Sequence, residues 1–172
     1  MTPKVLIVLT SHGKIDATGN PTGWYLVCST INHPSISTIE IYAQCMKEKE
    51  TNINYQPEFA HPHEALKDKV SLTIASPKGG EAPLDPASVK MFESDAVSQT
   101  FLKEQRALWE NTHKLEDMLP RVGEFDAIFY VGGHGRMFPP RQYTMIYLLS
   151  KKSKNKKNMH ANIHTYLQQC ST

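Results

Sequence analysis

A glycine-rich turn is the part of this sequence whose residue types most directly suggest chemistry. It follows an apolar run at residues 127–131 and consists of Gly132, Gly133, His134 and Gly135. In α/β enzymes such a turn brings backbone N–H groups up to a reacting oxygen, and the nucleophile arrives on the next strand. No such strand is expected here, because residues 139–172 are rich in Lys and Asn and contain no acidic residue. The glycine spacing also matches neither the P-loop motif nor the dinucleotide-binding motif, the two phosphate-binding fingerprints.

Glu58 is a second candidate site residue. It stands just before a short helix predicted by the run His61, Pro62, His63 and Glu64, since proline is tolerated in a first helical turn. The alternative role is structural, because an acid near a helix start interacts favourably with the helix dipole. His61 and His63 with Glu58 also imitate a metal site, but a His-x-His pair without a defined second shell is weak evidence, and we assign no metal.

The cysteines favour a reducing compartment. The three in the chain, Cys28, Cys45 and Cys170, form neither a metal-binding pattern nor an even disulfide framework. The apolar run at residues 5–9 is too short for a signal peptide, and no stretch approaches the length of a membrane span. We therefore expect a cytoplasmic protein without a membrane partner.

The basic charge is concentrated near the C-terminus. Six of the 19 Lys and Arg residues lie in 139–172, so residues 1–138 carry 13 basic residues against all 17 acidic ones. This mildly acidic body has no nucleic-acid footprint. The Lys cluster at 151–157 could serve nuclear import or nucleic-acid binding, but short Lys/Asn runs without interleaved aromatic residues are usually only solvated.

The order of elements predicts an α/β fold with a mostly parallel sheet. Residues 4–10, 70–75 and 127–131 are short, branched, apolar runs typical of strands buried on both faces. Apolar residues repeating at seven between 101 and 115 predict one core-facing helix that Pro120 terminates. We expect the three strands to be parallel neighbours, with Glu58, the glycine turn and a long loop at 76–86 at their carboxyl edge.

Four segments together resemble the ThiJ/PfpI superfamily (class I glutamine amidotransferase-like), in its fungal stress-induced branch. They are residues 4–12 (KVLIVLTSH), 22–26 joined to 57–62 (TGWYL and PEFAHP), 75–86 (ASPKGGEAPLDP) and 126–135 (DAIFYVGGHG). The resemblance covers most of 1–26 and 57–138. It divides the chain into a partial domain at 1–138, an insert at 27–56 and a non-homologous basic tail at 139–172.

The resemblance implies a flavodoxin-like fold and the activity of a glutathione-independent glyoxalase, also called D-lactate dehydratase, a lyase of the stress response. Such enzymes convert the small aldehyde methylglyoxal to lactate without a cofactor, and members are often homodimers. A low-pKa cysteine attacks the aldehyde, a glutamate shuttles protons, and glycine-loop amides hold the oxyanion. By resemblance Glu58 is the glutamate, Gly132 and Gly133 form the oxyanion loop, and His134 lies beside the nucleophile elbow.

The chain departs from the family at the nucleophile. The family's Ala-Val-Cys-His-Gly-Pro elbow has no counterpart, Cys170 is followed only by Ser171 and Thr172, and Arg136 stands where relatives have proline. The sheet is therefore predicted to be incomplete, without the elbow strand and later strands. Three functions stay open: a glyoxalase-like enzyme by descent, a chaperone-like binding protein of the stress response, and a non-functional truncated product.

The insert at 27–56 has two explanations. Val27-Cys28 can be encoded GTATGT, Thr51-Asn52 can be ACTAAC and Gln56 can be CAG, which are the signals of a small fungal intron. The segment is then translated intron, and the tail is a second such event or a frameshift. The alternative is a genuine loop insertion, which folds tolerate because closure entropy rises by only about 0.6 kcal/mol per doubling of loop length.

The missing elbow predicts unreactive thiols. We expect Cys28, Cys45 and Cys170 all to react slowly with iodoacetamide near pH 6, because none is placed to be held as a thiolate. Mass spectrometry of the alkylated peptides measures each rate. One cysteine that labels rapidly at this pH, with loss of an associated activity, would contradict the prediction.

Overall fold

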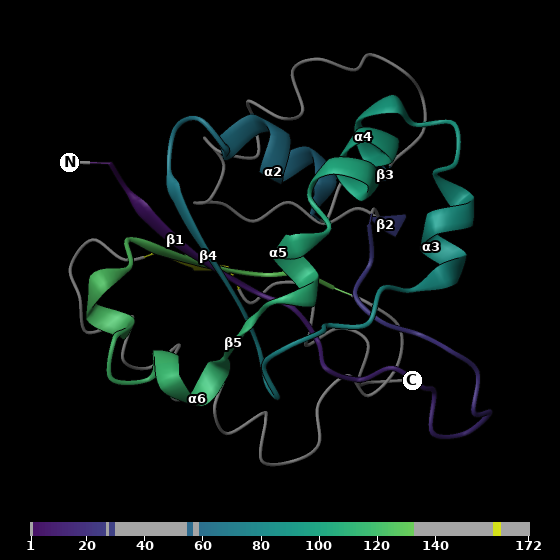
Figure 1. Ribbon diagram of the computed structural model, residues 1–172, viewed down its shortest axis with the longest axis horizontal. Helices are drawn as coiled ribbons and strands as arrows, with labels where there is room; N and C mark the ends of the chain where they lie inside the picture. The colour runs from purple at the N-terminus through teal and green to yellow at the C-terminus, as the bar shows by residue number, and fades with distance from the viewer. Residues whose placement is uncertain (1, 27, 30–54, 57–58, 133–159, 163–172) are drawn as a thin grey trace.

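The computed structural model describes residues 2–26, 28–29, 55–56, 59–132 and 160–162. Within them the main sheet has the strand order β5-β4-β1-β6-β7, and every neighbouring pair is parallel (Figure 1). The strands are β1 (Lys4–Val8), β4 (Ser71–Ser76), β5 (His113–Lys114), β6 (Ala127–Tyr130) and β7 (His160–Asn162). This architecture is an incomplete flavodoxin-like α/β fold, as predicted.

The three predicted strands are parallel neighbours, which confirms the central expectation for the sheet. β1 lies between β4 and β6, with Val5 opposite both Leu72 and Ala127. All of β1 after Lys4 is buried, as expected for a strand covered on both faces. Parallel pairing brings the carboxyl ends of β4, β1 and β6 to one edge of the sheet.

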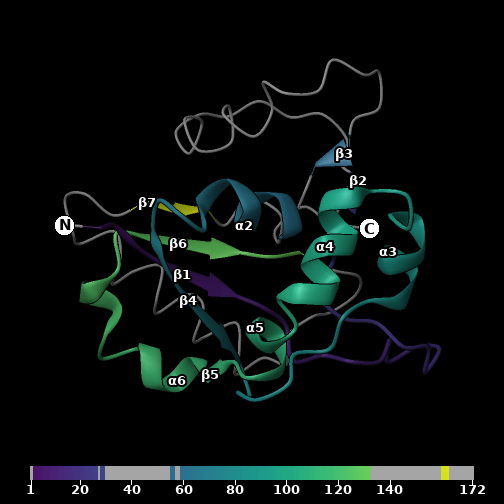
Figure 2. The same ribbon diagram turned by 45° about the horizontal axis from the view of Figure 1, so that its top comes forward.

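Alternate residues of β1 point into two separate cores. Val5 and Ile7 belong to a cluster with Phe59, Phe101 and Trp109, whereas Leu6 and Val8 pack with a second group that includes Leu115, Met118 and Phe125. The first core lies under α2 (Ala60–Leu66) and α4 (Ala96–Glu104), and the second lies against α6 (Leu115–Met118) and the 3₁₀ turn η1 (Val122–Glu124). Figure 2 shows α2 and α4 on one side of the strands and α6 on the other.

Two aspartates define the starts of helices on the first face. α3 (Pro86–Met91) begins after Asp85, whose carboxylate accepts the Ser88 N–H at 2.9 Å. α4 begins after Asp95, which accepts the Ser98 N–H at 2.9 Å. Each bond satisfies a backbone donor that the first helical turn leaves unpaired. None of the helices among the described residues combines the length and the apolar character needed to cross a membrane.

The predicted single helix through residues 101–119 is wrong. The structure has α4, then α5 (Ala107–Glu110), then β5, then α6. The break occurs where Thr112 Oγ1 donates a hydrogen bond to the Gly80 carbonyl at 2.6 Å, which holds the chain beside β4. Phe101 and Leu108 consequently pack in one core and Leu115 in the other, so their spacing of seven does not mark one helical stripe.

β7 occupies the edge of the sheet that the sequence predicts to be bare. His160–Asn162 pairs with β6 in parallel, with Ala161 opposite Ile128. The expectation that no strand pairs beyond β6 is therefore corrected, since backbone pairing needs no family motif. The three residues supply a short edge and none of them is a cysteine.

The two ends of the 27–56 insert meet in space. β2 (Cys28–Ser29) pairs antiparallel with β3 (Tyr55–Gln56), which places Cys28 opposite Gln56. Just inside the family-like sequence, the Phe59 N–H donates to the Leu26 carbonyl at 3.3 Å. The chain therefore leaves and re-enters the domain at one point, which is the geometry that either explanation of the insert requires.

Deleting residues 27–56 is expected to preserve the fold. The deletion makes Phe59 the third residue after Leu26, so the existing hydrogen bond becomes the closing bond of a β-turn with Pro57 in its second position, where proline is favoured. We expect an unchanged far-UV spectrum and an equal or higher Tm, because less chain must be ordered. Deleting the largely exposed loop at 14–21 is the control. A deletion variant that is unfolded would show that the insert is integral to the domain.

Candidate functional site

The predicted site residues fall only partly within the described part of the chain. Gly132 is described and is buried at the end of β6. Glu58, Gly133 and His134 lie outside the described residues, as do Cys45 and Cys170. The site is therefore built from the described segments that flank them at the carboxyl edge of the sheet.

Residues 23–26, which we call the crossing segment, connect the loops at this edge. The Trp24 N–H donates to the Pro83 carbonyl at 2.9 Å, and the Asp85 N–H donates to the Trp24 carbonyl at 3.0 Å. On its other side, the Tyr25 N–H donates to the Gly132 carbonyl at 2.9 Å. The crossing segment therefore joins the loop after β4 to the glycine turn after β6.

A buried polar cluster fastens the crossing segment to α3. Thr22 Oγ1 donates to Asp85 Oδ2 at 2.9 Å, and the Leu26 N–H donates to Ser88 Oγ at 3.3 Å. Ser88 in turn donates its hydroxyl to the Asp85 carbonyl oxygen at 2.8 Å. Because Thr22, Asp85 and Ser88 are almost fully buried, each of these bonds offsets a desolvation cost that would otherwise fall on the fold.

Gly23 is required by the closeness of this contact. A Cβ atom at Gly23 would lie 2.0 Å from the Pro83 carbonyl oxygen and 2.4 Å from its carbon. These are backbone atoms of the partner loop, so a side chain there forces the two segments apart. The glycine is thus explained by close approach of two backbones.

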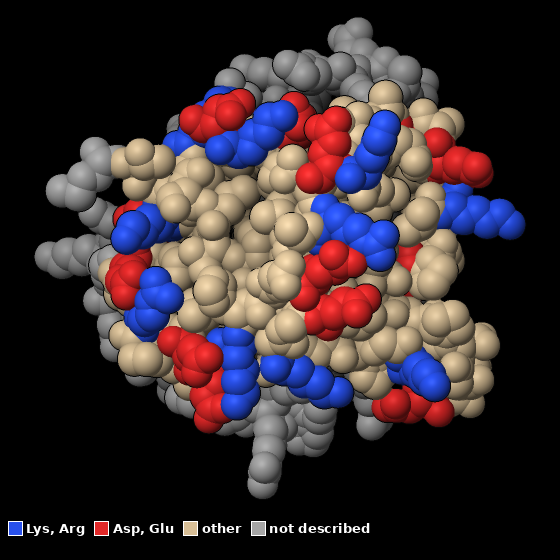
Figure 3. All heavy atoms as spheres, viewed as in Figure 1, with Lys and Arg blue, Asp and Glu red and all other residues tan. Residues whose placement is uncertain are grey.

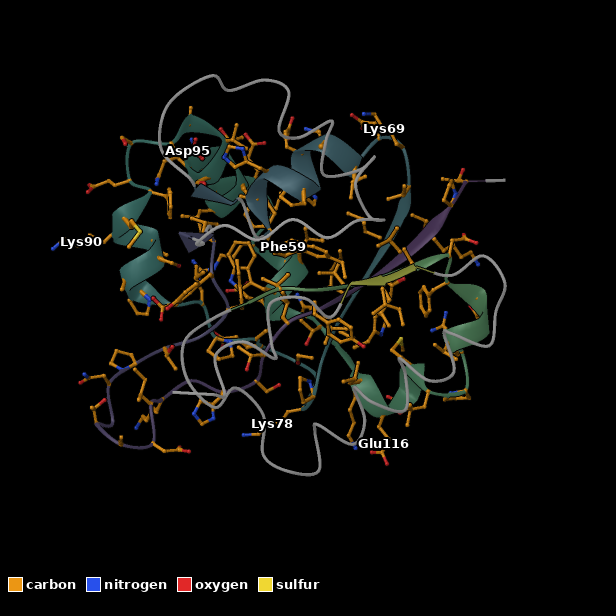
Figure 4. The ribbon with its side chains drawn as sticks, turned by 180° about the vertical axis from the view of Figure 1, so that it is seen from behind. Phe59, Lys69, Lys78, Lys90, Asp95 and Glu116 are labelled. Carbon is orange, nitrogen blue, oxygen red and sulfur yellow. The ribbon has the colours of Figure 1, made fainter. Side chains whose placement is uncertain are left out.

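Aromatic packing holds Phe59 against the crossing segment. Phe59, which follows Glu58 in sequence, is fully buried and meets the Trp24 ring edge-on at 5.5 Å between centroids. Phe101 and Trp109 complete the cluster, and Trp24 Nε1 donates to the Ala82 carbonyl at 3.2 Å. Figure 4 shows Phe59 in the interior, whereas Lys69, Lys90 and Glu116 lie at the periphery.

The two histidines of α2 do not converge on a common ligand. His61 Nε2 lies 2.8 Å from Asp95 Oδ2, while His63 is buried against Phe59 and Phe101. Burial would raise the pKa of Asp95, but hydrogen bonds from Ser98 and His61 outweigh it and lower the pKa to about 2. Across the described residues, no group of three His, Cys, Asp or Glu side chains is placed to hold a metal ion.

Charges of both signs are interspersed on the face seen in Figure 3. Among the described residues, exposed ion pairs between near neighbours include Glu64 with Lys67, Arg106 with Glu110 and Arg121 with Glu124. Such exposed pairs contribute little to stability. The expectation of no nucleic-acid partner stays a prediction.

The sequence alone did not reveal the polar residues that fasten the crossing segment to α3. Thr22, Asp85 and Ser88 have ordinary types for loops and helix starts, and only the contacts reveal that they form one cluster. A usable signal was present in Asp85-Pro86, because an aspartate followed by proline is typical of a helix N-terminus. That signal predicts the cap but not the bond to Thr22.

Comparisons with known proteins place the fold. No family model matches the chain, and no curated protein matches it. Among solved structures, APC35852 is similar at 27% identity and a TM-score of 0.56, over 94% of this chain and 56% of that one. The Rapid Encystment Protein REP24 of Francisella tularensis is similar at 24% identity and a TM-score of 0.52, over 88% of this chain and 55% of that one.

The chain shares a ThiJ/PfpI-like fold. Both structures have this class I glutamine amidotransferase type of fold. The likeness to REP24 concerns the fold alone. The chain spans little more than half the length of either structure.

Gly23→Ala should destabilise the domain strongly. The added methyl group meets the Pro83 carbonyl at a distance that no rotamer relieves, and we expect a loss of about 1–3 kcal/mol or more in the free energy of unfolding. Gly123→Ala is the matched control, because a Cβ there meets no atom within 4 Å. Urea unfolding of both variants measures the difference. Equal stability of the two variants would contradict the close contact between the crossing segment and the loop after β4.

Proposed function

We propose that this chain carries one half of a ThiJ/PfpI-type glyoxalase site, the half that positions the proton-transferring glutamate and the oxyanion loop. The reaction is the glutathione-independent conversion of methylglyoxal to lactate. We further propose that the 172-residue chain does not perform this reaction alone, because the family's cysteine elbow has no counterpart in its sequence.

The crossing segment is the observation that supports this proposal. It accepts the N–H of Phe59, the residue after Glu58, through the Leu26 carbonyl, and it donates from Tyr25 to Gly132, the first glycine of the turn. Three consecutive residues, Trp24, Tyr25 and Leu26, thus bind the loop after β4, the turn after β6 and the sequence neighbour of Glu58. This edge is where doubly wound α/β folds place their ligands.

The proposed roles follow from the chemistry of an α-oxoaldehyde. A thiolate adds to the aldehyde carbon, and backbone N–H groups of the turn at Gly132 and Gly133 stabilise the resulting oxyanion. Glu58 then takes the proton from that carbon and returns a proton to the neighbouring carbon, before water releases lactate. Without the thiolate there is no adduct, so neither Glu58 nor the turn has a reacting group on which to act.

The purified chain is expected to consume methylglyoxal no faster than buffer. Loss of methylglyoxal and formation of lactate, measured with protein free of host enzymes, test this directly. Robust turnover by the unmodified chain would overturn the proposal. Prevention of aggregation of a denatured client without turnover would favour the chaperone-like alternative, and absence of folded protein would favour a non-functional product.

A restored chain tests the role of Glu58. It lacks residues 27–56 and carries an elbow segment with the following strands from a relative in place of 139–172. We expect Glu58→Gln to lower its turnover at least 10²-fold, the lower end of what positioned acid–base catalysis contributes, while alkylation of the new cysteine persists. Glu64→Gln, which changes an exposed glutamate of α2 paired with Lys67, is the control and should retain activity. Equal turnover of the two variants would remove Glu58 from the mechanism.

A further inference from the structure

His63 lies in an aromatic environment that suits a neutral imidazole. Its ring centroid is 5.1 Å from that of Phe101 and 6.2 Å from that of Phe59, in edge-on arrangements. Only 6% of the residue is exposed. His63 therefore forms part of the packing between α2 and α4, two helices that cover the same face of the sheet.

A proton on His63 is disfavoured at this position. Burial lowers the pKa of His63, and Lys67 lowers it further, while the nearby carboxylates of Glu64 and Asp68 oppose the shift. Glu104 on α4 faces the same region, since its charge acts on Lys67. The charged form has to be accommodated against two phenylalanine rings that also contact each other.

His61, two residues earlier, contacts a different part of α4. Its Nε2 lies 2.8 Å from Oδ2 of Asp95, the residue that precedes α4. His61 and His63 both lie in the first turn of α2, and they contact α4 through different groups, the Asp95 carboxylate and the Phe101 ring.

We propose that His63 is an acid-sensitive latch that releases α2 from the aromatic cluster when its ring takes up a proton. The neutral ring packs against Phe59 and Phe101, and the imidazolium leaves this position for water. His61 and Asp95 form a separate contact between α2 and the start of α4. The response is thus a loosening of the packing between α2 and α4 within a chain that stays folded at neutral pH.

The direction of the pH effect follows from the lowered pKa. The stabilisation is complete above the unfolded-state value of about 6.5 and is lost as pH falls toward the lower folded-state value. In that window the unfolding constant rises by up to about tenfold per pH unit for one proton taken up on unfolding. Asp95, with a pKa of about 2, keeps its charge throughout the window.

The protein contains its own reporter of this latch. Its two tryptophans, Trp24 and Trp109, both lie in the aromatic cluster and both contact Phe101. Tryptophan fluorescence therefore reports on the packing that His63 completes. The signal needs no substrate and no catalytic activity.

The experiment combines tryptophan emission, urea unfolding and an NMR titration of the full chain between pH 7.5 and 5. We expect the His63 ring to titrate below 6.5, the emission to shift to longer wavelength, and the unfolding constant to rise as pH falls. His63→Phe should reduce the pH dependence of that constant by several-fold or more. His113→Gln, which changes an exposed histidine of β5, is the matched control and should keep the full dependence.

Either of two results would overturn the latch. One is a His63 titration at or above 6.5 in the unmodified chain, which needs no variant to fold. The other is a folded His63→Phe variant whose emission and unfolding constant respond to acid as strongly as those of His113→Gln.

Discussion

The hydrogen bonding of the crossing segment is the constraint on which the described site depends. Trp24 exchanges backbone hydrogen bonds with the loop after β4, and Tyr25 donates to the turn after β6, so two loops far apart in sequence are held by adjacent residues. The contact is close enough to exclude a side chain at Gly23. The Asp85 cluster and the Trp24 ring add a buried polar and a buried aromatic attachment on the same side. Contacts within the protein therefore organise this edge of the sheet.

This organisation explains how the domain accommodates the insert at 27–56. The Leu26 carbonyl receives the Phe59 N–H, and the β2–β3 pair brings the two ends of the insert together. Phe59 is anchored by Trp24 and Phe101, so its position depends on the core. The aromatic cluster thus fixes Phe59, the residue that follows Glu58 in sequence. The proposed latch at His63 acts on the same cluster.

The sequence predicted the parts of the fold that depend on local pattern. Continuous apolar runs identified β1, β4 and β6, and their parallel adjacency followed from the α/β order. It failed where tertiary contacts decide: Thr112 bonds to Gly80 and breaks the expected helix, and β7 pairs through its backbone without a recognisable motif. For the candidate site, the motifs selected Gly132, which lies just after β6, and its role stays a prediction. The roles of Gly23, Thr22 and Asp85 arise from contacts across the fold. Such contacts leave no periodic signal in the sequence.

We expect the backbone hydrogen bonds of the crossing segment to cost as much free energy to open as those of a core strand. Amide hydrogen exchange of the full chain, resolved by NMR, tests it most directly, because exchange reports the free energy of opening each hydrogen bond. We expect the amides of Trp24, Tyr25 and Asp85 to exchange within about tenfold of the Ile7 amide in β1, since they open only when the core opens. Exchange of these three amides at the rate of an unprotected loop, with Ile7 still protected, would contradict it.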